Sequence, residues 1–83
     1  MGNYRLLIKP SAARELEKLP PKDRTRTVAK IRRLGSNPRP DGAEKLSGQD
    51  KYRLRQGDYR VLYSIDDTQA TVVIVRIGHR REA

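Results

Sequence analysis

The pattern that most restricts the fold lies in two short segments, where apolar and charged residues alternate. In Tyr52–Arg55, tyrosine and leucine alternate with two arginines. In Tyr59–Tyr63, apolar or aromatic residues occupy every second position. Side chains of a strand point to opposite faces in turn, so each segment predicts a strand with one apolar face. Gln56-Gly57-Asp58 separates them at the length of a hairpin turn. The two segments therefore predict a β-hairpin whose other face carries arginines.

The rest of the chain predicts what covers the apolar face. Apolar residues recur at helical spacing in two stretches separated by Pro20-Pro21, which indicates a helical hairpin. We expect Pro10 to open the first helix and Ser11 to cap it. The predicted elements are a strand over Asn3–Lys9, helices over Pro10–Leu19 and Pro21–Leu34, a loop over 35–48, and strands over Lys51–Arg55, Tyr59–Ile65 and Thr71–Ile77.

This order, β-α-α-β-β-β, predicts an α+β fold in which an antiparallel sheet carries a helical hairpin on one face. The length of 83 residues allows one small domain and not two, so we expect residues 1–83 to form a single domain. The other face of the sheet is then free to bind a ligand.

Composition excludes several classes of function. The chain has no cysteine and one histidine, which excludes disulfides, a thiolate nucleophile and the usual zinc ligand sets. We therefore expect no metal and no cofactor. No apolar run approaches the roughly 18 residues of a membrane span, and the N-terminus lacks the core of a signal peptide, so a cytoplasmic protein is expected.

The net charge predicts a polyanionic partner. Lys and Arg number 19 against 10 Asp and Glu, which gives a formal charge of +9. Most of the cations are arginines, whose planar guanidinium suits phosphate better than the lysine ammonium does. RNA, DNA or a ribosome would fit this charge. The alternatives are a solvated basic surface or one neutralised by an acidic protein.

Three arginines are expected to converge on the open face of the hairpin. If the apolar set faces the helices, Arg53, Arg55 and Arg60 share the opposite face, where their charges repel one another until an anion binds. An ordinary solvated face is the alternative. His79 follows the last predicted strand and is the one side chain that titrates near neutrality without perturbation. It stands beside Arg80 and Arg81, which favours a role in the site. The alternative is a surface histidine without a function.

The carboxylates do not form the close cluster that a metal-dependent nuclease needs, since Asp66-Asp67 are expected in a turn. Cleavage of RNA would then proceed by attack of the 2′-hydroxyl on the adjacent phosphate. The protein would align the attack and neutralise the developing charge with arginines. DNA lacks this hydroxyl, so the reasoning favours RNA.

Three motifs resemble the signature of the RelE/ParE superfamily of toxins from toxin–antitoxin systems. They are Lys45-Leu46-Ser47-Gly48, the block Tyr52-Arg53-Leu54-Arg55-Gln56-Gly57-Asp58-Tyr59-Arg60-Val61-Leu62-Tyr63, and Arg76-Ile77-Gly78-His79-Arg80-Arg81-Glu82, with Lys9–Pro20 typical as well. The resemblance spans nearly the whole chain and implies a small-ribonuclease-like fold. For the RelE branch it implies a toxin that enters the ribosomal A site, cleaves mRNA without a metal and so inhibits translation.

The resemblance also assigns roles to individual residues. Catalysis is carried over to Arg55, Arg60, His79 and Arg80, and phosphate or RNA binding to Lys45, Arg53, Arg55 and Arg81. The pKa of arginine is too high for easy proton abstraction, so Arg55 is expected to stabilise charge and His79 to transfer protons. The branch has an aromatic residue shortly beyond Arg80, and the sequence reaches Ala83 before supplying one. We expect attenuated activity, unless this family member ends there naturally.

The resemblance leaves a second function open. The ParE-like branch poisons DNA gyrase without enzymatic chemistry, and the two branches share one fold. The converging arginines and His79 favour the RelE-like endoribonuclease, an mRNA interferase. Either branch implies a cognate acidic antitoxin, RelB-like in the preferred case, that neutralises the basic surface. A complex of toxin and antitoxin that binds operator DNA is a further possibility.

Overall fold

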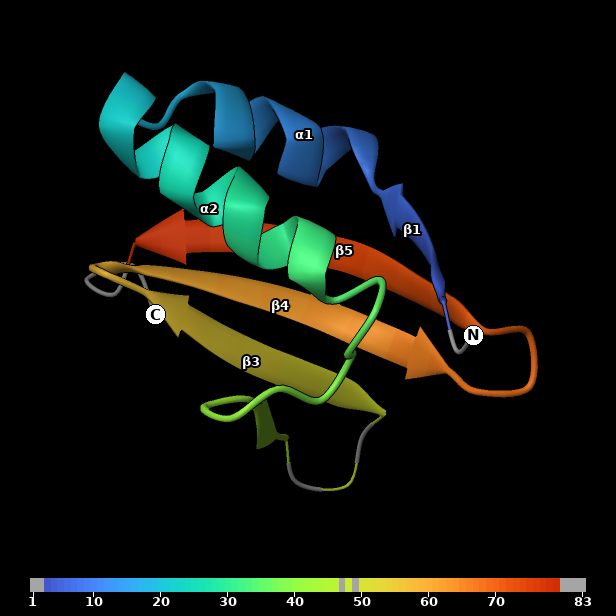
Figure 1. The fold of residues 1–83 in the computed structure, drawn as a ribbon. Helices are drawn as coiled ribbons and strands as arrows, with labels where there is room; N and C mark the ends of the chain where they lie inside the picture. The colour runs from blue at the N-terminus through green and yellow to red at the C-terminus, as the bar shows by residue number, and fades with distance from the viewer. Residues whose placement is uncertain (1–2, 47, 49, 80–83) are drawn as a thin grey trace.

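The computed structural model describes residues 3–46, 48 and 50–79. Its strands form a five-stranded sheet in the order β1-β5-β4-β3-β2, with both helices on one face (Figure 1). The α+β class predicted from the sequence is confirmed. The elements are β1 (Arg5–Ile8), α1 (Pro10–Glu17), α2 (Pro21–Arg33), β2 (Glu44–Lys45), β3 (Lys51–Gln56), β4 (Tyr59–Asp66) and β5 (Thr71–His79).

Both helices begin at a proline, whose fixed φ suits the first helical position. Pro10 begins α1 and Pro21 begins α2. The expectation that Ser11 caps α1 was wrong, because Lys9 occupies the cap position and no side chain bonds there. In α2, Asp23 in the first turn and three cations in the last turn complement the helix dipole. No helix in the described part of the chain is long and apolar enough to cross a membrane.

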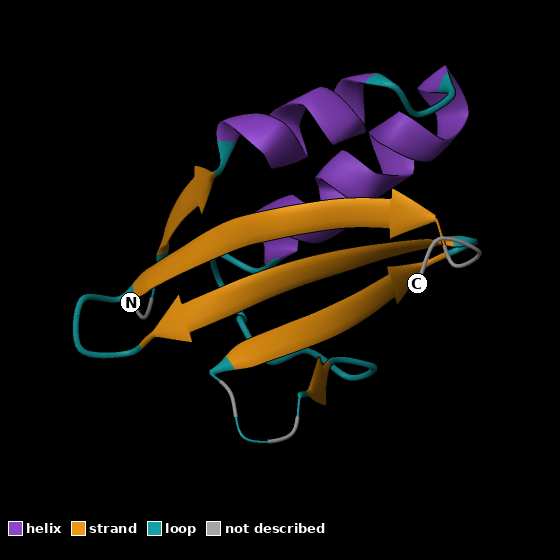
Figure 2. Ribbon diagram, turned by 180° about the vertical axis from the view of Figure 1, so that it is seen from behind, coloured by secondary structure: helices purple, strands orange, loops and turns teal. Residues whose placement is uncertain are grey.

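The core lies between the helices and the concealed face of the sheet. The predicted alternation is confirmed, since Leu54, Val61 and Tyr63 are buried, and Tyr52 and Tyr59 pack against them. Seen from behind, the other face of β3, β4 and β5 is not covered by the helices (Figure 2). The buried apolar set is Ala12, Leu19, Ile31, Leu34, Leu54, Val61, Tyr63, Ile65, Val72, Ile74 and Ile77.

Two features of the sheet differ from the expectation. The sheet is antiparallel among β2 to β5, but β1 pairs with β5 in parallel, with Arg5 opposite Thr71. The meander brings β5 to the edge where β1 lies, and nothing in either strand's own pattern sets their relative direction. The predicted loop over 35–48 also contains the two-residue strand β2. It pairs with β3, which places Lys45 opposite Tyr52.

A polar network fixes the loop that follows α2. Arg39 donates two hydrogen bonds to the carboxylate of Asp67, at 2.8 and 3.2 Å, and a third to the Tyr52 hydroxyl at 3.0 Å. The Tyr4 hydroxyl donates to the same carboxylate at 2.7 Å. The bonds from Arg39 and then Tyr4 hold the pKa of Asp67 below its usual value. The network joins the residue that precedes β1, strand β3, the loop and the turn between β4 and β5.

The buried Tyr63 holds the same loop from inside the protein. Its hydroxyl donates to the Pro38 carbonyl at 2.8 Å, and its ring stacks on Tyr52 with centroids 5.7 Å apart. Burial raises the pKa of Tyr63 to about 12. The loop is therefore attached to the sheet at two adjacent points, Pro38 and Arg39.

Candidate nucleic-acid interface

A hollow of about 300 Å³ opens on the uncovered face of the sheet. We call it the arginine pocket. Its lining comes from β3, β4, β5 and the residue that follows β2. The lining residues are Leu46, Arg53, Arg60, Leu62, Arg76, Gly78 and His79.

The strand register explains how the three arginines meet. Arg53, Leu62 and Arg76 lie opposite one another on β3, β4 and β5, so two arginines flank one leucine. Neighbouring strands lie about 4.8 Å apart, which puts the Cα atoms of the two arginines about 10 Å apart. In the next row along the sheet, Arg60 lies opposite Gly78. A guanidinium therefore enters from each of the three strands.

The floor of the pocket is apolar and has room above it. Leu62 is half-buried between the arginines, and Leu46 borders it. Gly78 carries no side chain, and the position that a Cβ would occupy there has no heavy atom of the surrounding protein within 4 Å. The pocket thus combines fixed positive charge with space for a ligand.

Arg53 and Arg76 form ion pairs with carboxylates at the rim. Arg53 lies 2.9 Å from Glu44 of β2, and the Nε atom of Arg76 lies 3.7 Å from Glu15 of α1. Arg60 is half-buried, and its Nε atom is shielded from solvent. Solvent-exposed pairs of this kind contribute little net stability, about 0–1 kcal/mol. A phosphate could therefore replace either carboxylate at small cost.

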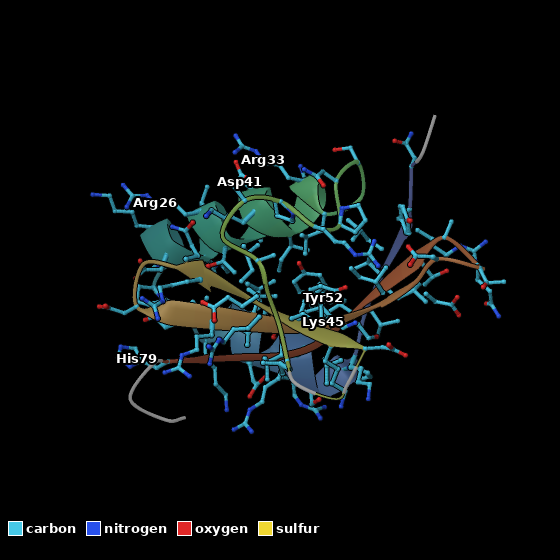
Figure 3. The ribbon with its side chains drawn as sticks, turned by 90° about the horizontal axis from the view of Figure 1, so that it is seen from below. Arg26, Arg33, Asp41, Lys45, Tyr52 and His79 are labelled. Atoms are coloured by element: carbon cyan, nitrogen blue, oxygen red, sulfur yellow. The ribbon has the colours of Figure 1, made fainter. Side chains whose placement is uncertain are left out.

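His79 lies where β5 reaches the pocket. It stands opposite Tyr59 in the register, and the two rings meet edge to face, with centroids 5.2 Å apart and planes at 88°. The contact restricts the orientation of the imidazole at the rim of the pocket. Figure 3 shows His79 at the end of the sheet where the described part of β5 stops.

The sequence of residues 6–83 matches the model of a family described as the ParE toxin of type II toxin–antitoxin systems. The chain belongs to the RelE/ParE family of toxins. Toxin RelG of Mycobacterium tuberculosis (strain ATCC 25618 / H37Rv) is 36% identical to it over 83 residues, which cover 95% of this chain and 93% of the relative. The toxin predicted from the sequence motifs is thereby confirmed as a member of a type II toxin–antitoxin system.

Solved structures agree with this assignment. The toxin–antitoxin complex RelBE2 of Mycobacterium tuberculosis contains a chain with a TM-score of 0.82 and 34% identity, covering 94% of this toxin and 92% of that chain. An archaeal RelE–RelB complex from Pyrococcus horikoshii OT3 gives a TM-score of 0.83 and 29% identity, with 98% and 99% covered. The RelE-like fold expected from the resemblance is confirmed.

The structure brings some of the predicted site residues together and separates others. Arg53, Arg60 and His79 line the arginine pocket of the toxin. Arg55 lies directly opposite Arg60 on the same face, but its side chain is exposed and is not part of the lining. Lys45 borders a different hollow and lies well away from His79 (Figure 3).

Two of the predicted residues, Arg80 and Arg81, lie outside the described part of the toxin. Ala83, on which the expected attenuation of activity depends, lies outside it as well. Conversely, four lining residues had no predicted role in the site: Arg76, Leu46, Leu62 and Gly78. Leu62 is an apolar residue on a face expected to be basic, and Leu46 reaches the pocket because the preceding β2 pairs with β3. Arg76 could have been predicted as a site residue, since it is the first residue of the C-terminal motif that resembles the toxin family.

The arrangement can bind and stabilise negative charge. Arginine stays protonated at any physiological pH, so the three guanidiniums supply permanent hydrogen-bond donors in a fork that matches phosphate oxygens. Among the residues that the structure describes, no group of three or more His, Asp or Glu side chains is placed to hold a metal ion.

Proposed function

We propose that the toxin cleaves messenger RNA on the ribosome and that the arginine pocket binds the backbone around the cleaved bond. The observation that carries the proposal is the meeting of Arg53, Arg60 and Arg76 around one hollow, with His79 at its rim. A toxin that acted only by protein contact would not need guanidiniums from three strands arranged around a space of this size. The names of the relatives, RelG and RelE, support the same activity.

The chemistry follows from the groups in the pocket. The 2′-oxygen attacks the adjacent phosphorus, the 2′-O–P bond forms, and the bond to the 5′-oxygen of the next nucleotide breaks. The products are a 2′,3′-cyclic phosphate and a 5′-hydroxyl. Arg60 stabilises the charge that develops on the non-bridging oxygens. One proton must leave the attacking 2′-hydroxyl and one must reach the departing 5′-oxygen; His79 transfers one of the two and water carries the other. Arg80, by the resemblance, contacts the same phosphate.

Other predicted residues take supporting roles in this proposal. Arg53 and Arg55 bind phosphates that flank the cleaved bond, and Arg81 and Lys45 extend the contact along the backbone. None of these groups fixes the 2′-oxygen in line with the leaving oxygen. The ribosome supplies that alignment, which in intramolecular models contributes up to roughly 7–11 kcal/mol. Free RNA is therefore a poor substrate.

The partner proposed for the toxin is an acidic antitoxin. The formal charge of +9 suits such a partner, and two of the similar solved structures are complexes of a toxin with an antitoxin. Bound to the open face, the antitoxin would cover the arginine pocket and exclude mRNA. A complex of the two that binds operator DNA extends this proposal.

Primer extension on a reporter mRNA in a translating extract tests the proposal. Added toxin should produce new 5′ ends within codons, and an excess of the antitoxin encoded beside it should abolish them. The same mRNA without ribosomes should remain intact. Absence of new 5′ ends while translation stops would refute cleavage.

Poisoning of DNA gyrase is the second candidate, because the matching family model is the ParE toxin. A supercoiling assay with purified gyrase separates the two. Inhibition of supercoiling by the toxin, together with intact mRNA in the extract, would support the second candidate and reject the first.

A further inference from the structure

Arg76 reaches the arginine pocket only because the pairing of β4 and β5 is irregular. Val72 and Ile74 are buried, so strict alternation would place Arg76 on the concealed face with them. The register shifts at Leu62 and Tyr63, which lie opposite Arg76 and Ile74, and Val75 is left as an extra residue. Beyond this bulge Ile77 is buried and Arg76 points to the open face.

Glu15 of α1 holds this part of β5 through both carboxylate oxygens. One oxygen accepts a hydrogen bond from the backbone N–H of Ile77 at 2.8 Å, and the other lies 3.7 Å from the Nε atom of Arg76. The pairing of β1 with β5 ends at Ile74, so this N–H lies on a stretch of β5 that β1 does not reach. One side chain therefore fixes the backbone after the bulge and faces the arginine that the bulge turns outward.

We propose that Arg76 is a further phosphate-binding residue of the arginine pocket, and that Glu15 positions it until RNA binds. The inference rests on the proposed function, since it adds a contact to the same site. Arg76 flanks Leu62 from β5 as Arg53 does from β3, so a backbone that crosses the pocket meets both. The arginine side chain is 59% exposed, which leaves it accessible to a ligand.

Each of the two ion pairs at the pocket joins an arginine of the sheet to a glutamate of a neighbouring element. Like charges around one hollow repel one another, and Glu44 offsets that of Arg53 and Glu15 that of Arg76, each from outside the three strands that carry the arginines. The contact of 3.7 Å between Glu15 and Arg76 is longer than a good hydrogen bond. A phosphate oxygen at about 2.8 Å would therefore make a shorter, stronger contact with Arg76 than this carboxylate does.

The dependence of RNA binding on salt tests the role of Arg76. The full toxin is titrated into a fluorescein-labelled, 2′-O-methylated single-stranded decanucleotide, which cannot be cleaved, and anisotropy is followed at several KCl concentrations. Each phosphate neutralised on a single strand contributes about 0.7 to the slope of log K against log salt. Arg76→Ala should reduce the slope by about 0.7, whereas Arg76→Lys should retain most of it.

Arg26→Ala is the control matched in charge. Arg26 is exposed on α2, in the helical layer and away from the open face (Figure 3). Its loss removes one positive charge without touching the pocket, so the slope should stay at the wild-type value. Equal slopes for Arg76→Ala and Arg26→Ala, with both proteins folded by circular dichroism, would overturn the inference.

Two substitutions of Glu15 separate its roles. Glu15→Gln keeps an acceptor for the Ile77 N–H but removes the negative charge that competes with phosphate, so the decanucleotide should bind several-fold more tightly at low salt. Glu15→Ala removes the acceptor as well, and should lower the melting temperature. Unchanged or weaker binding by a stably folded Glu15→Gln variant would refute the competition between Glu15 and phosphate for Arg76, and an unchanged melting temperature for Glu15→Ala would refute its positioning role.

Arg60→Ala in the same titration distinguishes this inference from the proposed function. A reduced slope for Arg60→Ala but not for Arg76→Ala would reject the role of Arg76 and leave the pocket as an RNA site. Wild-type slopes for both would reject the pocket itself. Reduced slopes for both support the two proposals together.

Discussion

The comparison of Arg60 with Arg55 gives the sharpest test of the proposed chemistry. The two residues lie directly opposite each other on one hairpin and carry the same charge. Arg60 is half-buried in the arginine pocket, whereas the Arg55 side chain is exposed and outside the lining. Substitution of each by alanine therefore removes the same group from two neighbouring positions that differ in access to the bound phosphate.

The expected magnitudes follow from this difference. Loss of a preorganised donor to the transition state costs about 2.7–4 kcal/mol. At about 1.36 kcal/mol for each tenfold change, Arg60→Ala should cleave about 100- to 900-fold more slowly. An exposed charge is screened by water, and contributions of about 0–1 kcal/mol predict at most about a fivefold loss for Arg55→Ala.

Single-turnover cleavage of mRNA on programmed ribosomes, followed by primer extension, measures both rates. Circular dichroism and the melting temperature establish that each variant is folded. A rate for Arg60→Ala within threefold of the wild type would refute the assignment of Arg60 to the cleaved phosphate. A larger loss for Arg55→Ala than for Arg60→Ala would show that the reacting phosphate lies outside the arginine pocket.

Three further predictions concern stability. Tyr63→Phe removes the hydrogen bond to the buried Pro38 carbonyl and should lower the free energy of unfolding by about 1–3 kcal/mol. Differential scanning calorimetry should then show a fall in melting temperature of at least about 4 °C. The folded state lowers the pKa of Asp67, so its pairing with Arg39 stabilises the protein above about pH 4 and this stabilisation is lost as the pH falls through the folded pKa. The melting temperatures of the wild type and of Asp67→Asn should therefore differ at neutral pH and converge below the folded pKa of Asp67. Ala70 has a φ of +50°, so Ala70→Gly should raise the urea midpoint, with a net gain of up to about 1 kcal/mol.

Local pattern was sufficient to predict the faces of the hairpin. Alternation in β3 and β4 placed Leu54 and Val61 inside and Arg53 and Arg60 outside, because the side chain direction depends only on position along an unbroken strand. The same rule fails at Arg76. A bulge depends on how two strands pair, and nothing in the sequence of β5 alone marks Val75 as the extra residue.

The remaining differences come from pairing over long distances. Glu44-Lys45 has no preference for strand structure, and β2 exists because β3 lies beside it and Arg53 reaches Glu44. The direction of β1 relative to β5 is a property of the complete sheet. The contact of Glu15 with Ile77 could not be predicted for the same reason, since it joins a helix near the start of the chain to β5.

The position of β5 inside the sheet has a consequence for synthesis. β5 lies between β1 and β4, and it contributes three buried side chains, Val72, Ile74 and Ile77. Of the strands that the structure describes, it is also the last to leave the ribosome that makes the chain. Until then β1 has no strand to pair with, the core lacks the buried side chains of β5, and the pocket lacks Arg76 and His79. Pairing between such distant segments is slow to form. On the proposed function, a nascent toxin would therefore stay inactive toward its own ribosome for most of translation, which leaves time for an antitoxin to meet it as it folds.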